Sequence, residues 1–428
     1  MFTRKRNVLD ILENLSSLQR ESAPSVLVRV DFNVPINQGK IADDSRIRGA
    51  IPTIQAILES KCNVILVSHL GRPKRIQRGE DTDGTERSKL TLGPVAKHLA
   101  EIMKRDVLFS EDCLGDTAKS VISLLPSQGG GIVLLENLRF YKGEEKNDVE
   151  FARALASYAD AYVNDAFGTC HRAHASTVGV PSLMDSRFCG IGMLVSSELK
   201  YLDFSNLPEG SCVAAIIGGS KISTKLPVIQ GVLKQVNVLI LGGGLAFTFL
   251  KAQGISVGDS LVEDSMLDTA LKLLEEAKRE GKQIVLPLDA VCANSFPQSP
   301  MKVEDTKTFD LNSSAGIEDG YIGLDVGPKS ISFIQTSLAG VTEILFNGPL
   351  GVFEIPPFDE GTKHLVNILS DLTSQGVVTV VGGGDSVSAL TTFGKADEVT
   401  YVSTGGGASL ELLAGDVLPG VEVIGNVQ

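Results

Sequence analysis

Basic and polar side chains follow four short apolar runs in the first half of the chain. They are Arg29, Asp31, Asn33, His69, Arg72, Arg139, His171 and Arg172. Arginine recognises phosphate and carboxylate through planar, paired hydrogen bonds, so basic groups gathered from separate segments are typical of an anion site. Arg46 adds a cation at a helix start, where the helix dipole prefers an anion. These cations could instead be ordinary surface charges, and we interpret only the neighbouring Arg48 in that way.

In the second half of the chain, glycine clusters follow the apolar runs where basic and polar side chains follow them in the first half. They stand at 218–219, 242–244, 382–384 and 405–407, each between an apolar run and an apparent helix start. Glycine lets a backbone approach a ligand closely, and the N–H groups at a helix start attract phosphate. One such cluster is more often a tight turn, but four in one topological position favour a nucleotide site. Neither G-x-G-x-x-G nor G-x-x-x-x-G-K-[ST] occurs, so no dinucleotide fingerprint or P-loop is indicated.

Charged residues near these glycines suit a polyphosphate and its metal ion. Lys221 and Lys225 have a spacing that places both on one face of a helix start. Cations oppose the helix dipole there, so a bound polyphosphate explains them better than solvent does. Asp385 is either a helix N-cap or a Mg²⁺ ligand beside nucleotide phosphates. Glu354 is a weaker candidate for hydrogen bonds with ribose hydroxyls.

The sequence contains no evident protein nucleophile. H-E-x-x-H does not occur, no close nucleophile–base pair emerges, and His98, His174 and His364 are expected to be structural or solvated. Two bound ligands would therefore react with each other directly. Phosphoryl transfer fits this pattern because it depends mainly on positioning and charge stabilisation.

The elements that must position these residues alternate along the chain. Short β-branched runs are followed by helix-period segments, which is typical of βαβ units and parallel sheets. Strands are predicted at 26–30, 63–67, 132–135, 161–163, 213–217, 236–241, 283–288, 343–346, 377–381 and 398–402. So many strands favour two α/β domains, with a boundary near 185–210, a helix at 196–204 and an exposed loop at 77–88.

Composition excludes several classes of protein. The 428 residues suggest two or three domains at about 150 residues each. A net charge of −13 argues against a general nucleic-acid or anionic-membrane binder. Tryptophan is absent, which argues against a platform that stacks bases or sugars. No apolar run reaches the roughly 18 residues that a membrane span needs.

Cysteine usage and the start of the chain favour the cytosol. The six cysteines are scattered without a C-x-x-C pair, so they are expected to be reduced, mostly buried thiols rather than zinc ligands. The basic start is soon followed by Asp10 and Glu13, and transit peptides avoid acids.

The chain resembles the phosphoglycerate kinase family. The motifs that carry the resemblance run in family order from about residue 26 to the end of the chain. They are RVDFNVP (29–35), SHLGRP (68–73), LLENLRF (134–140), YVNDAFGTCHRAHAST (162–177), IIGGSK (216–221), ILGGGLAFTFLKAQG (240–254), GLDVGP (323–328), NGPLGVFE (347–354), GGGDS (382–386) and STGGGASLELL (403–413).

The resemblance implies a fold and a reaction. The fold would be two doubly wound parallel-sheet domains separated by a cleft: a phosphoglycerate-binding domain at 1–188, a hinge helix at 189–205, a nucleotide-binding domain at 206–410 and a returning tail at 411–428. The reaction would be transfer between 1,3-bisphosphoglycerate plus ADP and 3-phosphoglycerate plus ATP, with Mg²⁺, by domain closure. We expect a cytoplasmic monomer with no nucleic-acid or membrane partner.

The resemblance also implies residue roles. Phosphoglycerate would be held by Asp31, Asn33, Arg46, His69, Arg72, Arg139 and Arg172. The transferring group would be stabilised by Arg46, Lys221 and the amides of Gly383, Gly384, Gly405 and Gly406. The nucleotide would be bound by Lys225, Gly242, Gly243, Gly244, Asn347, Glu354, Gly383, Gly384, Asp385 and Ser386. Asp385 would bind the metal.

The chain departs from the family pattern in a few places. Thr224 stands where Asp is usual, Asn294-Ser295 replaces Asp-Lys, Phe346 replaces a common Trp, and the first 24 residues match poorly. None of these removes a catalytic group. Two rival functions stay open: a catalytically silent ligand-binding protein, and an NAD-dependent oxidoreductase, which would lack its glycine fingerprint here.

Overall fold

The chain forms two compact units. The structure, a computed structural model, describes residues 4–37, 39–204, 207–300 and 302–427. Met1–Lys200 and Val417–Gln428 make up the first unit, and Tyr201–Asp416 the second. The chain leaves the first unit within α10 (Met193–Leu202). The returning segment begins at Val417, six residues after the predicted start at 411.

A six-stranded parallel sheet forms the centre of the first unit. Its order is β5 (Leu108–Ser110), β6 (Ile132–Leu135), β4 (Asn63–Val67), β1 (Ser25–Val30), β7 (Ala161–Asp165) and β8 (Cys189–Ile191). Each neighbouring pair is parallel, as the alternating sequence pattern predicts. Parallel pairing brings the carboxyl ends of β1, β4, β6 and β7 to one edge of the sheet.

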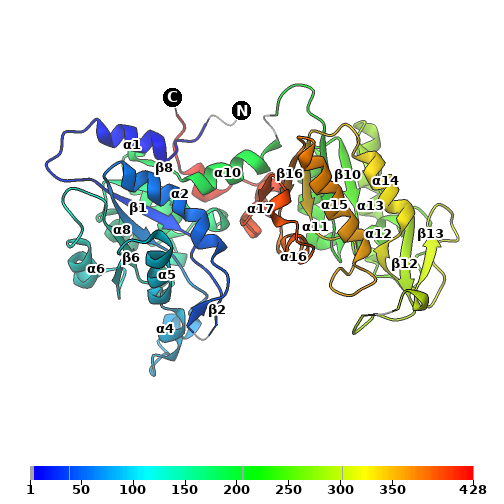
Figure 1. Cartoon of the computed structure of the whole chain (residues 1–428), viewed down its shortest axis with the longest axis horizontal. Helices are drawn as coiled ribbons and strands as arrows, with labels where there is room; N and C mark the ends of the chain where they lie inside the picture. Colours follow the sequence, from blue (N-terminus) through cyan, green and yellow to red (C-terminus); the bar gives the residue numbers. More distant parts are fainter. Residues whose placement is uncertain (1–3, 38, 205–206, 301, 428) are drawn as a thin grey trace. The chain divides into compact units, whose positions relative to one another are not determined.

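Successive residues of each strand face opposite sides of this sheet, and helices cover both sides. Val26, Val28 and Val30 of β1 pack in one core with α1 (Val8–Ser16), α2 (Ser45–Glu59) and α5 (Gly93–Met103). The alternate residues face the other way, where α6 (Gly115–Ile122) contacts β5 and β6. Figure 1 shows α2 lying along β1.

The poorly matching start of the chain is part of the first unit. Asn7 caps α1 by accepting from the backbone N–H groups of Leu9 and Asp10, and Asp10 accepts in return from the Asn7 N–H. Arg6 N donates to Gly425 O at 3.0 Å, which ties the two ends of the chain together (Figure 1). The end segments therefore stabilise each other.

The second unit contains another six-stranded parallel sheet. Its order is β11 (Gln283–Val285), β10 (Val238–Leu241), β9 (Val213–Ile217), β15 (Glu343–Asn347), β16 (Val378–Val381) and β17 (Tyr401–Val402). α14 (Pro328–Ser337) and α15 (Glu360–Ser374) lie side by side and share a core with this sheet (Figure 1). The sequence did not predict a smaller antiparallel sheet, formed by β13 (Lys307–Asp310), β12 (Asp289–Ala293) and β14 (Ile322–Val326).

Two predicted segments differ from the structure because acidic side chains cap helices there. The expected loop at 77–88 is wrong, since it contains the end of α3 (Lys74–Arg78) and most of α4 (Thr85–Leu90). The carboxylate of Asp81 accepts from the Glu86 and Arg87 amides at the start of α4. The helix expected at 196–204 begins instead at Met193, because Asp165 accepts from the Leu194 and Val195 amides.

Two predicted strands have half of their expected length or less. The run at 283–288 pairs only as far as Val285, shortly before Pro287, which has no N–H to donate. The run at 398–402 contributes only Tyr401–Val402, because Ala396–Glu398 is a 3₁₀ turn. None of the helices in the described ranges is long and apolar enough to span a membrane.

Candidate active site

The predicted anion-binding residues of the first unit stand at one edge of its sheet. Asp31 follows β1, His69 follows β4, and Arg139 lies in the short 3₁₀ turn after β6 (Leu138–Phe140). Arg46 is the second residue of α2. Arg46 Nη1 donates to Asp31 Oδ2 at 2.8 Å, which joins the start of the helix to the end of the strand.

Backbone and amide contacts hold the loops at this edge. Asn33 Oδ1 accepts from Gly71 N at 2.8 Å, and Arg139 Nη1 donates to Gly71 O at 2.9 Å. Gly71 therefore links the loops that follow three different strands. Arg72 and Arg172 are exposed.

This edge carries more positive than negative charge. Burial and the neighbouring cations Arg29, Arg139 and Arg46 hold the pKa of His69 well below its ordinary value. Burial also lowers the pKa of Arg139. Arg139 Nε is buried with no hydrogen-bond partner in the described part of the chain, and it lies 3.6 Å from Glu145 Oε1, beyond hydrogen-bond distance. A buried donor without a hydrogen bond suits an anionic ligand.

The glycine clusters of the second unit serve two different purposes. A Cβ at Gly218 would stand 2.0 Å from Pro349 O, and one at Gly243, where φ is +66°, would stand 2.7 Å from Gly219 O. These two clusters therefore allow loops of the protein to cross each other. At Gly384 and Gly406 nothing lies within 4 Å of an added Cβ. The open backbone is thus at the starts of α16 (Gly384–Thr392) and α17 (Gly407–Ala414).

The two predicted lysines are not equivalent. Lys221 is exposed and occupies the N-cap position of α11 (Ile222–Leu233), outside the helix, so the expectation that both lysines share one helical face is wrong. Lys225 is half-buried, and its Nζ donates to Asn347 Oδ1 at 2.6 Å. Burial lowers the pKa of Lys225, and the charge of Asp385 opposes that shift.

Asn347 presents its amide nitrogen to the glycine loop before α16. Its side chain is fully buried, and Nδ2 has no hydrogen-bond partner within the described ranges. A Cβ added to Gly383 would lie 3.2 Å from that nitrogen. Lysine has only donors, so its bond to Oδ1 fixes the orientation of the amide. The arrangement offers two N–H donors beside a helix N-terminus.

The N-cap interpretation of Asp385 is wrong. Gly383 occupies the N-cap position of α16, and no side chain caps that helix. Asp385 is exposed in the first turn, where its carboxylate is available to a cation. Ser386 is buried, and its Oγ accepts from Gly348 N at 2.6 Å. Ser386 therefore stabilises the loop after β15.

A cavity of about 570 Å³ lies among these loops in the second unit. The lining residues that matter for the site are Gly219, Gly243, Gly244, Phe247, Leu261, Phe296, Glu354 and Asp385. One part is apolar and the other consists of glycine backbone and carboxylates. That division suits a ligand with a flat apolar group and a charged group.

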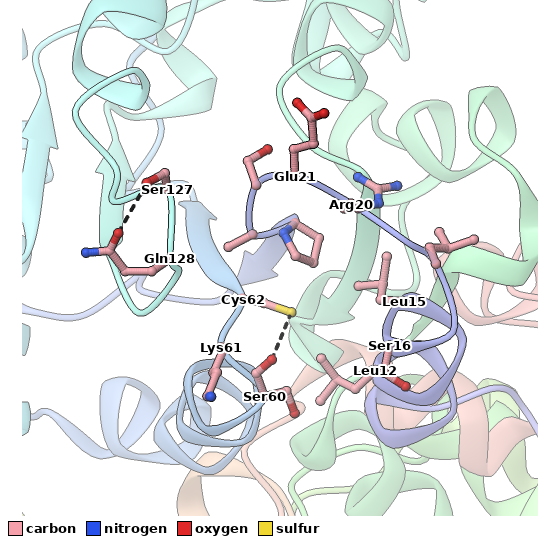
Figure 2. A pocket seen from close by; sticks show the side chains of 14 residues that line it. Leu12, Leu15, Ser16, Arg20, Glu21, Ser60, Lys61, Cys62, Ser127 and Gln128 are labelled. Carbon is pink, nitrogen blue, oxygen red and sulfur yellow. Dashed lines mark hydrogen bonds between the residues drawn. The ribbon is translucent and has the colours of Figure 1, made fainter.

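A second cavity, of about 280 Å³, lies at the opposite edge of the first unit's sheet (Figure 2). Its lining includes Pro24 and Cys62, which precede β1 and β4. Cys62 Sγ lies 3.7 Å from Ser60 O, and burial raises the thiol pKa to about 11. In open α/β sheets ligands bind beyond the carboxyl ends of the strands, so this cavity is not our candidate.

Comparison with known proteins identifies the family of this chain. The phosphoglycerate kinase family model matches residues 20–416. A phosphoglycerate kinase of Synechococcus sp. (strain JA-2-3B'a(2-13)) is 47% identical over 93% of this chain and 94% of its own length. The cytosolic phosphoglycerate kinase of Triticum aestivum is 48% identical over 92% of this chain and 94% of its own. The chain belongs to the phosphoglycerate kinase family.

Solved phosphoglycerate kinases share the fold. The structure from Coxiella burnetii superposes with a TM-score of 0.81 at 35% identity, covering 96% of this chain and 97% of its own. As a member of this family the chain is a transferase. The reaction of the family is the glycolytic transfer of a phosphoryl group between 3-phosphoglycerate and ATP. The predicted family and the two-domain α/β fold class are therefore confirmed.

The positions that depart from the phosphoglycerate kinase pattern have clear local environments. Phe346 is fully buried in the core of the second unit. Thr224 Oγ1 donates to Lys221 O at 2.9 Å. Asn294 and Ser295 are exposed beside Phe296, which lines the cavity.

The sequence did not identify three buried residues behind the basic edge. Arg29 was counted among the basic residues without a role, and Glu144 and Ser176 were not singled out. All three are fully buried and hydrogen-bonded to one another. The local sequence around Glu144 gives no sign of its burial, because its partner Ser176 lies 32 residues away along the chain.

Proposed function

We propose that this chain transfers a phosphoryl group directly from the acyl phosphate of 1,3-bisphosphoglycerate to ADP. The acyl P–O bond breaks, a bond forms from phosphorus to the terminal oxygen of ADP, and 3-phosphoglycerate leaves as a carboxylate. No protein nucleophile takes part. The observation that carries the proposal is the Arg46–Asp31 bond at a cationic sheet edge, in a chain whose other unit holds an amide-lined cavity.

The first unit would bind the phosphoglycerate. Arg139 and His69 would donate to its anionic oxygens, and the exposed Arg72 and Arg172 would complete the set together with Asn33. Asp31 would orient Arg46, whose remaining N–H groups would stabilise charge on the transferring group. The buried Nε of Arg139, which makes no hydrogen bond within the described residues, supports this assignment.

The second unit would bind the nucleotide. The apolar part of the cavity, with Phe296 and Leu261, would take the base, and Glu354 the ribose hydroxyls. The backbone of 242–244 would line this pocket. Asn347 Nδ2 and the open amides at Gly383, Gly384 and Gly406 would bind phosphate oxygens, with Lys221 beside the transferring group. Lys225 would contribute to phosphate binding through its bond to Asn347, which fixes the orientation of the Asn347 amide.

The residues present fit a magnesium ion. Mg²⁺ prefers oxygen ligands and usually combines one or two carboxylates with phosphate oxygens and water. Asp385 offers one exposed carboxylate two residues after Gly383, whose added Cβ would lie 3.2 Å from the buried Asn347 Nδ2. When bound, the metal would neutralise phosphate charge.

Transfer would require the two units to close on their ligands. Each ligand is assigned to a separate unit, and the reacting atoms must come within about 3–3.5 Å. Closure would also exclude water from the acyl phosphate. Small-angle scattering with neither, one or both ligands tests this step. An unchanged radius of gyration with both ligands bound would contradict it.

A coupled assay tests the activity. The purified chain should form ATP from ADP and 1,3-bisphosphoglycerate in the presence of Mg²⁺. Absence of turnover together with retained binding of both ligands would instead support the catalytically silent alternative. We place the protein in a reducing compartment such as the cytoplasm, because all six cysteines are free and five of them are buried.

A further inference from the structure

We propose that Arg29 is a positioning residue that fixes His69 as the tautomer with its proton on Nε2. His69 would then present one uncharged N–H donor at the basic edge of the first unit. Arg29 itself would contact no ligand, because its side chain is fully buried. The inference rests on the proposed function only for the identity of the ligand that His69 meets.

The donors of Arg29 are directed to three acceptors. Nε donates to Ser176 Oγ at 2.7 Å, and Nη1 donates to Val30 O at 2.5 Å. Nη2 lies 3.2 Å from His69 Nδ1. A guanidinium has five donors and no acceptor, so His69 Nδ1 must accept in this pair. Nδ1 therefore carries no proton, and a neutral ring has its proton on Nε2.

A buried acid holds Arg29 in place. Ser176 Oγ donates to Glu144 Oε1 at 2.6 Å, and Ser176 N donates to Glu144 Oε2 at 3.0 Å. Since the single hydroxyl proton goes to Glu144, the lone pairs of Ser176 Oγ are left for Arg29. Tyr162 OH donates to Ser176 O at 2.7 Å and fixes the same turn. The chain of contacts thus runs from Glu144 through Ser176 and Arg29 to His69.

The surroundings of His69 disfavour the other protonation states. A carboxylate commonly holds a histidine Nδ1–H, but Asp31 Oδ1 lies 3.9 Å from Nδ1, beyond hydrogen-bond distance. Asp31 is already bonded to Arg46. Burial and the cations Arg29, Arg139 and Arg46, with His174, hold the pKa of His69 well below its usual value, which favours the neutral ring.

The Nε2 atom has no hydrogen-bond partner among the residues that the structure describes, and it is not a fully enclosed atom. It is therefore available to a ligand. A neutral N–H donor with a fixed direction can bind an anionic oxygen without carrying a charge of its own. It cannot take up a proton at Nε2, so His69 would orient the substrate and would not act as a base.

Histidine ¹⁵N resonances in the unliganded protein test the proposal directly. With the five histidines labelled, the His69 signals are assigned by their loss in His69→Gln. We expect the Nδ1 shift of an unprotonated nitrogen and the Nε2 shift of a protonated one at pH 7. An Nδ1–H tautomer or a doubly protonated ring in the wild-type protein would overturn the proposal without any variant.

Two variants with one matched control test the role of Arg29. Arg29→Met should give a mixture of tautomers, and Arg29→Lys, which keeps a donor, should restore the Nε2–H form. Arg46→Met is the control, because it removes a nearby cation that makes no bond to His69. An unchanged tautomer in Arg29→Met, or the same shift in Arg46→Met, would contradict the proposal. If Arg29→Met does not fold, Ser176→Ala is tested in its place, and we expect a partial shift of the His69 tautomer equilibrium.

Kinetics separate this inference from the proposed function. In Arg29→Met we expect KM for 3-phosphoglycerate to rise about tenfold, the worth of one charge-assisted hydrogen bond, with KM for ADP unchanged. An equal rise in both constants would indicate general disruption and contradict the positioning role. A wild-type protein with the Nε2–H tautomer and no ATP formation would refute the proposed function alone. Active protein with a protonated Nδ1 would refute the inference alone.

Discussion

Arg46 and Asp31 are joined by a hydrogen bond from Nη1 to Oδ2 at 2.8 Å, although they belong to different elements of the first unit. Asp31 is 9% exposed and Arg46 is 34% exposed. Within the described residues Arg46 makes no second hydrogen bond. One edge of the guanidinium is therefore fixed, and its other donors stay available for a ligand.

Arg46→Ala should reduce kcat by about 10³-fold or more, because one charge-stabilising arginine contributes that much to phosphoryl transfer. Arg46→Lys should retain part of the rate, since it keeps the charge and loses the planar fork. Steady-state kinetics measure both, and calorimetry should show unchanged ADP binding. Arg48→Ala is the matched control, because Arg48 is 60% exposed and paired with Asp44. Near-normal turnover of Arg46→Ala would refute its role.

Asp385→Asn should raise the Mg²⁺ concentration needed for half-maximal rate by roughly tenfold or more, because it removes one of the few carboxylates available to the metal. Titration of Mg²⁺ at fixed ADP gives this value, and calorimetry with Mg²⁺ and ADP gives a second readout. Asp264→Asn serves as control, since Asp264 is exposed and paired with Lys251 away from the cavity. An identical Mg²⁺ titration would count against the metal assignment.

Phe296→Ala should raise KM for ADP by roughly tenfold, the worth of one aromatic contact of about 1–1.5 kcal/mol. Phe296 lines the cavity although it is 53% exposed, which suits a side chain that a ligand covers. KM for 3-phosphoglycerate should not change. Val303→Ala, at a site 70% exposed and outside the cavity lining, should change neither constant. If the phosphoglycerate constant rises instead, the base is not bound here.

Asp165 should make the first unit less stable as the pH rises from about 4 to 6. Burial raises the pKa of this carboxyl to about 6, with Thr53 and the amides of Leu194 and Val195 opposing the shift. The folded state then holds a proton that the unfolded chain, with a pKa near 3.8, has released. The resulting decrease in the free energy of unfolding grows to about 3 kcal/mol between about pH 4 and 6 and stays constant at higher pH.

Asp165→Asn should remove this pH dependence, since the amide oxygen still accepts from the start of α10. Hydrogen exchange of the β1 and β4 amides between pH 4 and 7 measures the difference from wild type. Glu101→Gln is the control, because Glu101 is 77% exposed. A difference that does not vary with pH would show that Asp165 titrates at its ordinary pKa.

Much of the site followed from the order of residue types along the chain. The strand before His69, at Asn63–Val67, and the helix that begins with Ser45-Arg46 were predicted because hydrophobic period and chain stereochemistry are local properties. The loop at 77–88 was mispredicted because Asp81 folds back on the start of a helix. The start of α10 was missed because Asp165 caps it from 29 residues away.

The sequence by itself determined the family, the alternation of strands and helices, and which residue types stand at the strand ends. Only the tertiary structure decided that Gly218 and Gly243 are needed for loops to cross, while Gly384 and Gly406 are open. It also decided that Lys225 orients Asn347 and that Arg29 meets His69 Nδ1. The physical reason is that hydrogen-bond direction and burial depend on partners 40 to 122 residues away along the chain, which no local pattern encodes.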